Sequence, residues 1–128
     1  MDFKDLEIYK LARGIEKDAW EIYSDFDREA KHIIGDQFIR SVDSIAANIA
    51  EGCGRFHYLD RNKFNYNARG SLSESWHWLD ILKERGYISD ALHGRISENL
   101  KNLEIKLNNY IKAVKMQKEE NSDKIAKQ

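Results

Sequence analysis

Basic and aromatic side chains alternate between residues 55 and 69. This stretch contains four arginine or lysine residues and one acidic residue, Asp60. Arginine and lysine bind phosphate and aromatic rings stack on bases, which is the combination that proteins use to bind single-stranded RNA. Charged residues beside a helix connection often do no more than keep it hydrated, and that is the alternative. The residues that we predict to contact RNA are Arg55, Arg61, Lys63, Arg69, Tyr58 and Tyr66.

A set of polar residues lies beside the apolar positions of the two segments that flank this stretch. Its members recur every three or four positions, so each group marks one face of a helix. If the two helices form a hairpin, Arg69 comes within reach of Ser44 or Asn48. Such a half-buried network fixes helix register, since each unpaired member costs about 1–3 kcal/mol. A binding site is the alternative. The members are Gln37, Ser44, Asn48, Glu51, Arg69, Ser71 and Glu74.

Patterns typical of enzymes are rare in the chain. Cys53 and His57 resemble a nucleophile and its base only by proximity, and a lone cysteine at a helix end is usually inert. Two Glu-x-x-His sequences, ending at His32 and His77, have the spacing found in di-iron bundles. The first lies in a polar connection and the second within a helix, so we do not expect them to meet. We therefore predict no enzyme activity, no catalytic residue, no metal site, no cofactor and no small-molecule substrate.

The composition favours a small helical protein. The chain of 128 residues provides one domain's worth of core, and its 34% charged residues and lack of proline favour a few long helices over many short strands. A single cysteine excludes an internal disulfide framework. No apolar run approaches the roughly 18 residues that would cross a bilayer. We therefore expect a cytoplasmic protein without membrane partners.

Apolar residues recur every three or four positions in four segments, which predicts four amphipathic helices. Residues 27–31 interrupt the first pattern, and Gly52 and Gly54 end the second through left-handed conformations. Asp60 caps the third helix, and Gly86 ends it. The predicted core positions are Ile8, Leu11, Ile15, Ala19, Ile22 and Phe26 in the first segment, Ile34, Phe38, Val42, Ile45 and Ile49 in the second, Phe64, Ala68, Leu72, Trp76, Leu79 and Leu82 in the third, and Leu92, Ile96, Leu100, Leu103, Leu107, Tyr110 and Val114 in the fourth.

Four long helices with short connections predict an all-α fold, an antiparallel up-down-up-down four-helix bundle. Ser89 or Asp90 caps the fourth helix, and beyond Gln117 the chain has no apolar face to bury. We therefore expect residues 1–118 to form the bundle and residues 119–128 to form a mobile polar tail.

Two of the helices carry more large apolar side chains than one buried face requires. Aromatic residues that cluster beside a core face are typical of a second interface, although a wide core is the alternative. We therefore expect the chain to assemble as a homo-oligomer. The residues that we assign to this interface are Trp20, Tyr23, Trp78 and Ile81.

The stretch from Ser44 to Arg55 resembles the Ser-Ile-x-x-Asn-Ile-Ala-Glu-Gly-x-Gly-Arg motif of the four-helix-bundle family named for the 23S rRNA intervening-sequence protein. The stretch from Ala68 to Glu74 matches the second signature of this family, and the chain's first helix is also similar. Ala46 stands where many members have proline, which should straighten the second helix.

The resemblance implies a small bacterial cytoplasmic protein with a ribosomal-protein label, which often forms a homopentameric ring. A related bundle assists the reverse transcriptase of diversity-generating retroelements and binds RNA. Together with the basic and aromatic residues, the resemblance predicts a non-catalytic, self-assembling bundle that contacts RNA or ribonucleoprotein. The alternative is a protein–protein adaptor or scaffold that binds no nucleic acid.

Overall fold

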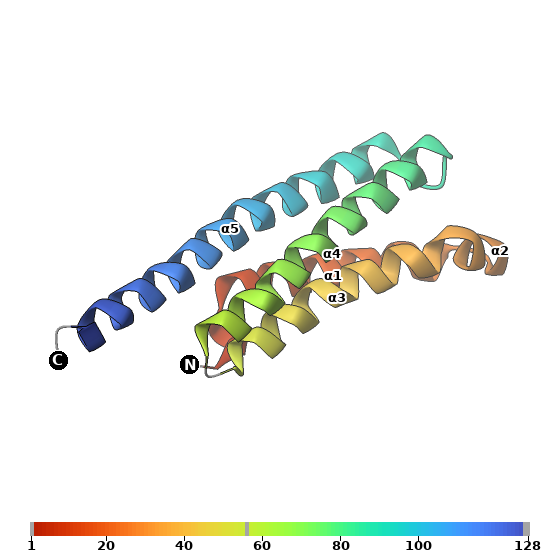
Figure 1. The fold of residues 1–128 in the computed structure, drawn as a ribbon. Helices are drawn as coiled ribbons and strands as arrows, with labels where there is room; N and C mark the ends of the chain where they lie inside the picture. The colour runs from red at the N-terminus through yellow and green to blue at the C-terminus, as the bar shows by residue number, and fades with distance from the viewer. Residues whose placement is uncertain (1, 56, 127–128) are drawn as a thin grey trace.

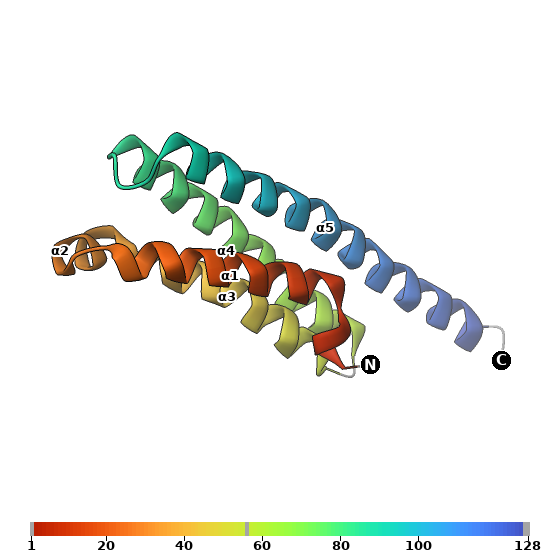
Figure 2. The same ribbon diagram turned by 180° about the vertical axis from the view of Figure 1, so that it is seen from behind.

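The chain folds into helices packed side by side, as the computed structural model shows (Figures 1 and 2). The structure describes the backbone of residues 2–55 and 57–126, and side chains up to residue 117 except that of residue 58. The elements are a 3₁₀ turn η1 (Phe3–Asp5), the helices α1 (Glu7–Asp25) and α2 (Arg28–Ala30), a π-helical turn η2 (Lys31–Gly35), and the helices α3 (Asp36–Cys53), α4 (Tyr58–Glu84) and α5 (Asp90–Ala126).

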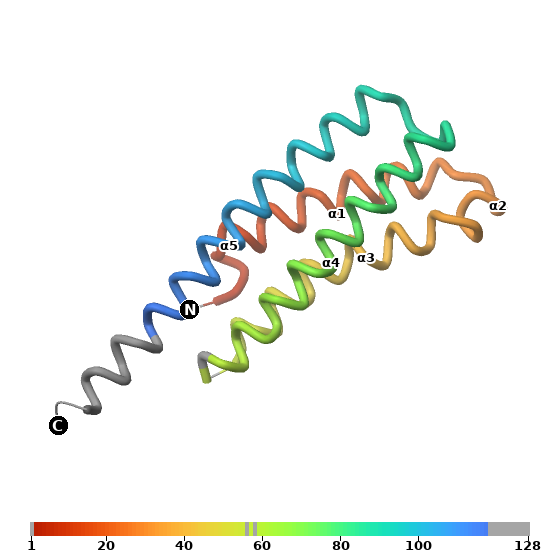
Figure 3. Tube along the Cα trace, turned by 45° about the horizontal axis from the view of Figure 1, so that its top comes forward, coloured from red at the N-terminus to blue at the C-terminus, as the bar shows by residue number. Residues whose placement is uncertain are grey.

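The four long helices form the predicted antiparallel bundle. The helix α3 packs between α1 and α4, and α5 packs between α4 and α1, so that α1 and α4 lie diagonally across the core. The turn from α3 to α4 lies at one end of the bundle, and α2 and the turn from α4 to α5 lie at the other (Figure 3). No helix in the described part of the chain has the length and hydrophobicity needed to span a membrane.

The core confirms most of the predicted apolar positions. All five predicted residues of the second segment, Ile34 in η2 and four in α3, are fully buried, as are Leu72, Leu79 and Leu82 of α4 and the central leucines of α5. In α1 the predicted core residue Leu11 is only partly buried, and its neighbour Ala12 is buried in its place. The predicted core positions that are partly rather than fully buried are Leu11, Phe26, Phe64, Trp76, Leu92 and Tyr110.

The connection after α1 is shorter than the predicted one. Asp27 caps the next helix, because its carboxylate accepts a hydrogen bond of 2.8 Å from the backbone N–H of Ala30. The chain is therefore helical from Arg28 onward, through the π-helical turn into α3. A β-carbon on Gly35 would lie 3.1 Å from the rings of Phe26 and Tyr23, so glycine lets this turn pack directly against α1.

The end of α3 differs from the prediction in its physical cause. Gly54 has φ −76°, so no left-handed residue ends this helix. Gly52 instead allows close packing, because a β-carbon there would lie 3.0 Å from the carbonyl oxygen of Arg61 and 3.0 Å from the β-carbon of Phe64. Glycine at position 52 therefore sets how closely α4 approaches α3.

The predicted end of α4 at Gly86 is confirmed. Gly86 has φ 79°, the backbone N–H of Gly86 donates to the carbonyl of Lys83 at 3.0 Å, and that of Tyr87 donates to the carbonyl of Leu82 at 2.8 Å. These two hydrogen bonds form a Schellman motif. The motif sets the direction in which the chain enters the turn before α5.

The starts of α4 and α5 differ in how they are capped. The helix α4 begins two residues before Asp60, and its capping residue, His57, makes no side-chain capping hydrogen bond, so the prediction for Asp60 was wrong. The helix α5 is capped by Ser89, whose hydroxyl accepts a 3.1 Å hydrogen bond from the N–H of Leu92. The backbone of α5 is helical as far as Ala126, but the side chains beyond 117 lie outside the described residues, so the tail at 119–128 stays a prediction.

Candidate nucleic-acid interface

Tyr66 on α4 lies between two cationic side chains. Its ring is 38% exposed. The guanidinium carbon of Arg69 lies 5.0 Å from the ring centroid, and the Nζ of Lys115 on α5 lies 5.6 Å from it. Both distances are within the range of cation–π attraction. The ring therefore holds one cation from its own helix and one from the neighbouring helix.

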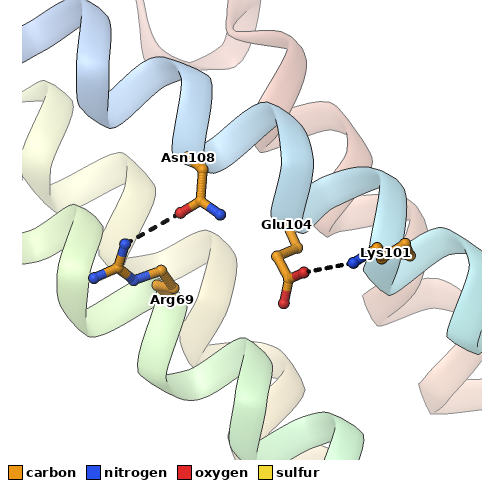
Figure 4. A network of polar contacts seen from close by, with 4 residues as sticks. All are labelled: Arg69, Lys101, Glu104 and Asn108. Atoms are coloured by element: carbon orange, nitrogen blue, oxygen red, sulfur yellow. Dashed lines mark hydrogen bonds and ion pairs between the residues drawn. The ribbon is translucent and has the colours of Figure 1, made fainter.

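A hydrogen bond ties the same cluster across the two helices. The Nη1 of Arg69 donates to the Oδ1 of Asn108 at 3.1 Å, and Figure 4 shows this bond spanning the space between α4 and α5. Farther along α5, Lys101 is paired with Glu104 at 3.1 Å. The Arg69 guanidinium is thus oriented by a neutral amide rather than by a carboxylate, and its positive charge remains.

Two further lysines extend this cluster along the bundle. Lys63 lies three residues before Tyr66 on α4, and Lys112 lies three residues before Lys115 on α5. Residues three apart share a helix face, so Lys63 lies on the same face as Tyr66 and Lys112 on the same face as Lys115. Both are exposed. We call Lys63, Tyr66, Arg69, Lys112 and Lys115 the basic α4–α5 surface. Within the described residues, none of its four cations forms an ion pair with a carboxylate.

The other predicted RNA-contacting residues lie at the turn between α3 and α4. Arg55 is paired with Glu51, and its guanidinium carbon lies 4.9 Å from the ring centroid of Phe64. The Nε of Arg61 donates to the carbonyl of Arg55 at 2.9 Å, so Arg61 holds the turn. The side chain of Tyr58 lies outside the described residues. Of the five predicted residues whose side chains the structure describes, Lys63, Tyr66 and Arg69 therefore belong to the basic α4–α5 surface, whereas Arg55 and Arg61 make contacts at the turn.

The positive charge of Arg61 also affects the pKa of Tyr110 at this end of the bundle. Burial raises the pKa of the Tyr110 hydroxyl, Cys53 adds to that effect, and the positive charge of Arg61 opposes it. Arg61 is itself only partly exposed. Its positive charge therefore lies near enough to Tyr110 to affect that hydroxyl.

Serine and asparagine side chains link α3 to α4. The hydroxyls of Ser44 and Ser71 are 2.9 Å apart, and Asn48 donates to both the carbonyl and the hydroxyl of Ser44. One turn farther on, Ser75 donates to the hydroxyl of Ser41 at 3.2 Å and is fully buried. The two contacts form a polar seam along the α3–α4 interface. The predicted network did not include Ser75, although its spacing of four residues from Ser71 places the two on one helix face.

The remaining members of the predicted polar network do not join this seam. Arg69 contacts Asn108 rather than Ser44 or Asn48, which corrects the predicted hairpin contact. The reason is helical geometry, because Arg69 and Ser71 point about 160° apart around α4. The Nε1 of Trp78 donates to the carboxylate of Glu74 at 3.3 Å, Glu51 is paired with Arg55, and Gln37 is exposed.

Two asparagines in α4, Asn62 and Asn65, are buried, which the sequence patterns did not predict. The Nδ2 of Asn62 donates to the carbonyl of Ile111 at 3.3 Å, which joins α4 to α5. The Nδ2 of Asn65 donates to the Oδ1 of Asn62 at 3.1 Å. Their spacing of three residues was the only signal in the sequence. These bonds help to set the axial register between α4 and α5, which brings Lys115 to Tyr66.

The four residues predicted at an oligomer interface differ in exposure. Trp20 is 59% exposed and stacks on Tyr23 with the ring centroids 5.5 Å apart. Tyr23 is partly buried and donates a 2.6 Å hydrogen bond to Asp36, which raises the pKa of the tyrosine hydroxyl. Trp78 and Ile81 are partly buried against the core. Of the four, Trp20 is the residue whose ring is left mostly in solvent.

Trp20 borders a shallow pocket between α1 and α3. Arg13, Glu16 and Asp43 also line it, and Arg13 is paired with Glu16 at 2.9 Å. Burial raises the pKa of the Glu16 and Asp43 carboxyls, and the positive charge of Arg13 opposes this effect. Within the described residues, no three His, Cys, Asp or Glu side chains are grouped as a metal ion would require.

The fold and motifs can be compared with those of known proteins. The family described as the 23S rRNA-intervening sequence protein matches residues 4–109 of the chain. A crystal structure of a protein of unknown function from the S23 ribosomal protein family of Bacteroides thetaiotaomicron is similar, with a TM-score of 0.77 and 21% sequence identity. The similarity covers 82% of this chain and 98% of that one. No curated protein matches the sequence.

Proposed function

Because the chain belongs to the 23S rRNA-intervening sequence protein family, we propose that it binds RNA through the basic α4–α5 surface, without catalysing a reaction. The observation that carries this proposal is the group of cations around Tyr66, which no carboxylate neutralises among the described residues. Lysine and arginine in such a group attract phosphate, and a partly exposed aromatic ring beside them can stack on a base.

A homo-oligomer would strengthen this binding. We propose that copies of the chain assemble as a ring, a homopentamer by family resemblance, in the bacterial cytoplasm and in association with the ribosome. Repeating one basic surface around a ring turns several weak contacts with a single RNA into tight binding. Light scattering at micromolar concentration tests the assembly, and a mass of one chain, 15.0 kDa, would contradict it.

Neutralising two cations of the surface tests the RNA proposal. In the double variant Arg69→Gln and Lys115→Gln, we expect affinity for a single-stranded uridine oligomer to fall about tenfold. The slope of log affinity against log salt should become shallower by about 1.4, because two phosphate contacts are lost. Fluorescence anisotropy across a salt series measures both quantities.

The matched control is the double variant Arg28→Gln and Lys10→Gln, which removes the same two charge types from exposed positions on α2 and α1. It should leave both the affinity and the salt slope near their original values. Neutralising Arg55, which is already paired with Glu51, should also change them little. Equal losses in the site and control variants would exclude the basic α4–α5 surface.

The ring of Tyr66 allows a separate test of base contact. We expect Tyr66→Ala to weaken binding of the same oligomer by about 5- to 150-fold, since stacking on an aromatic ring is worth about 1–3 kcal/mol per base. Tyr66→Phe keeps the ring and should bind like the original protein. The salt slope should stay unchanged in both, because neither variant removes a charge. An equal loss in the two variants would rule out stacking.

A protein–protein adaptor that uses no nucleic acid is the second candidate. The exposed ring of Trp20, beside the pocket that it shares with Arg13 and Asp43, favours this function. Purifying the protein from cells with and without nuclease treatment separates the two candidates. Partners that stay bound after nuclease treatment and are lost in Trp20→Ala would support the adaptor.

A further inference from the structure

A second surface feature lies at the end of the bundle away from the turn between α3 and α4. A pocket of about 300 Å³ opens between the C-terminal part of α1 and the turn that leads into α5. Its apolar wall consists of Ile22 on α1, Ile88 in the turn and Leu92 on α5. Ile88 and Leu92 are only partly buried, so the wall remains accessible. This volume is at the lower end of the range for ligand pockets and suits a short peptide segment.

Two aromatic rings form the pocket's edge, and the backbone holds both in place. The ring centroids of Phe26 and Tyr87 are 5.8 Å apart. The N–H of Phe26 donates to the carbonyl of Tyr23 at 3.1 Å, and Tyr87 is held by the Schellman motif around Gly86. Tyr87 is nevertheless 37% exposed, so its side chain is accessible at the edge of the pocket.

Carboxylates line the side of the pocket that α1 forms. Asp18, Glu21 and Asp25 line the pocket from α1, together with one cation, Arg95, which lies 3.9 Å from Asp18. Glu21 and Asp25 are exposed, and neither has an ion pair in the part of the chain that the structure describes. Residues 16–27 contain five acidic side chains and one basic one. This end of α1 therefore has the opposite charge to the basic α4–α5 surface.

We propose that this pocket is the docking site for a basic segment of a protein partner, which inserts one arginine or lysine next to an apolar residue. The carboxylates of Glu21 and Asp25 pair with the cation, and the ring of Tyr87 attracts it further. The apolar wall takes the aliphatic stem of the side chain and its apolar neighbour. RNA is excluded from this site, because phosphate is repelled by the same carboxylates.

The pocket and the basic α4–α5 surface are built from different residues. The pocket is built by the end of α1 and the start of α5, whereas the basic surface is built by the first half of α4 and the later half of α5. The residues that line the pocket therefore include neither Tyr66 nor Lys115. The docking proposal does not depend on RNA binding, since the residues of the two surfaces do not overlap.

A pair of small probes tests the site on the full chain. The first probe is N-acetyl-leucyl-arginine amide, and the second is its citrulline counterpart, which has nearly the same shape but no charge. We expect the arginine probe to shift the backbone amide NMR signals of Tyr87, Ile88 and Leu92 with saturation in the millimolar range. The citrulline probe should bind at least tenfold more weakly, because it cannot pair with the carboxylates.

Matched variants locate the binding. The double variant Glu21→Gln and Asp25→Asn should weaken the arginine probe about tenfold, whereas Glu98→Gln and Asp2→Asn, at exposed sites outside the pocket, should not. No shift at about 10 mM probe, or equal affinity for the two probes, would overturn the proposal. Shifts of the same signals that grow with protein concentration alone would also overturn it, because a second copy would then be the occupant.

Discussion

Replacing Leu103 with alanine should lower the free energy of unfolding by about 2–5 kcal/mol. Leu103 is 0% exposed and lies on the buried face of α5 with Leu100 and Leu107. The substitution removes three carbon atoms from a close-packed region and leaves a cavity that the rigid helices cannot fill. A urea denaturation curve should show a lower midpoint with the same slope.

The matched control for this variant is the substitution Ile105→Ala, two residues farther along the same helix. Ile105 is of similar size but 51% exposed, so Ile105→Ala should change the free energy of unfolding by less than about 0.5 kcal/mol. Similar losses in the two variants would mean that the face of α5 assigned to the core is wrong. That outcome would also remove the basis for placing Asn108 and Lys115 opposite α4.

Gly52→Ala should destabilise the protein by about 1–3 kcal/mol, although alanine is the better helix former. The new β-carbon would lie 3.0 Å from the carbonyl oxygen of Arg61, a backbone atom that cannot move unless α4 moves. The free energy of unfolding from urea denaturation measures this cost. A shift of α4 would also displace Lys63, so we expect weaker RNA binding as well.

Gly70→Ala in α4 should have the opposite effect and stabilise the protein. Gly70 is exposed, and a β-carbon there would meet nothing within 4 Å. Alanine should therefore raise the free energy of unfolding by about 0.5–1 kcal/mol, because it restricts the unfolded chain more than glycine does. If both glycine variants stabilise the protein, the close approach of α3 and α4 at position 52 is wrong.

The sequence by itself determined the bundle. The spacing of apolar residues in the four segments identified the buried faces, because a helix places residues three and four apart on one side. Gly86 and Ser89 were also readable, since a Schellman turn and a hydroxyl cap depend on residues close together in the chain. Asp27 was misread as part of a loop because the helix that it caps, α2, has only three residues before the π-helical turn begins.

Only the tertiary structure decided which side chains form the candidate sites. Helical spacing shows which face is buried, but it does not show which neighbour the residues at the edge of that face will meet. The axial register and rotation of α4 against α5 bring Lys115 to Tyr66 and Asn108 to Arg69. That register depends on side-chain packing and on hydrogen bonds between residues tens of positions apart, as between Asn62 and the carbonyl of Ile111.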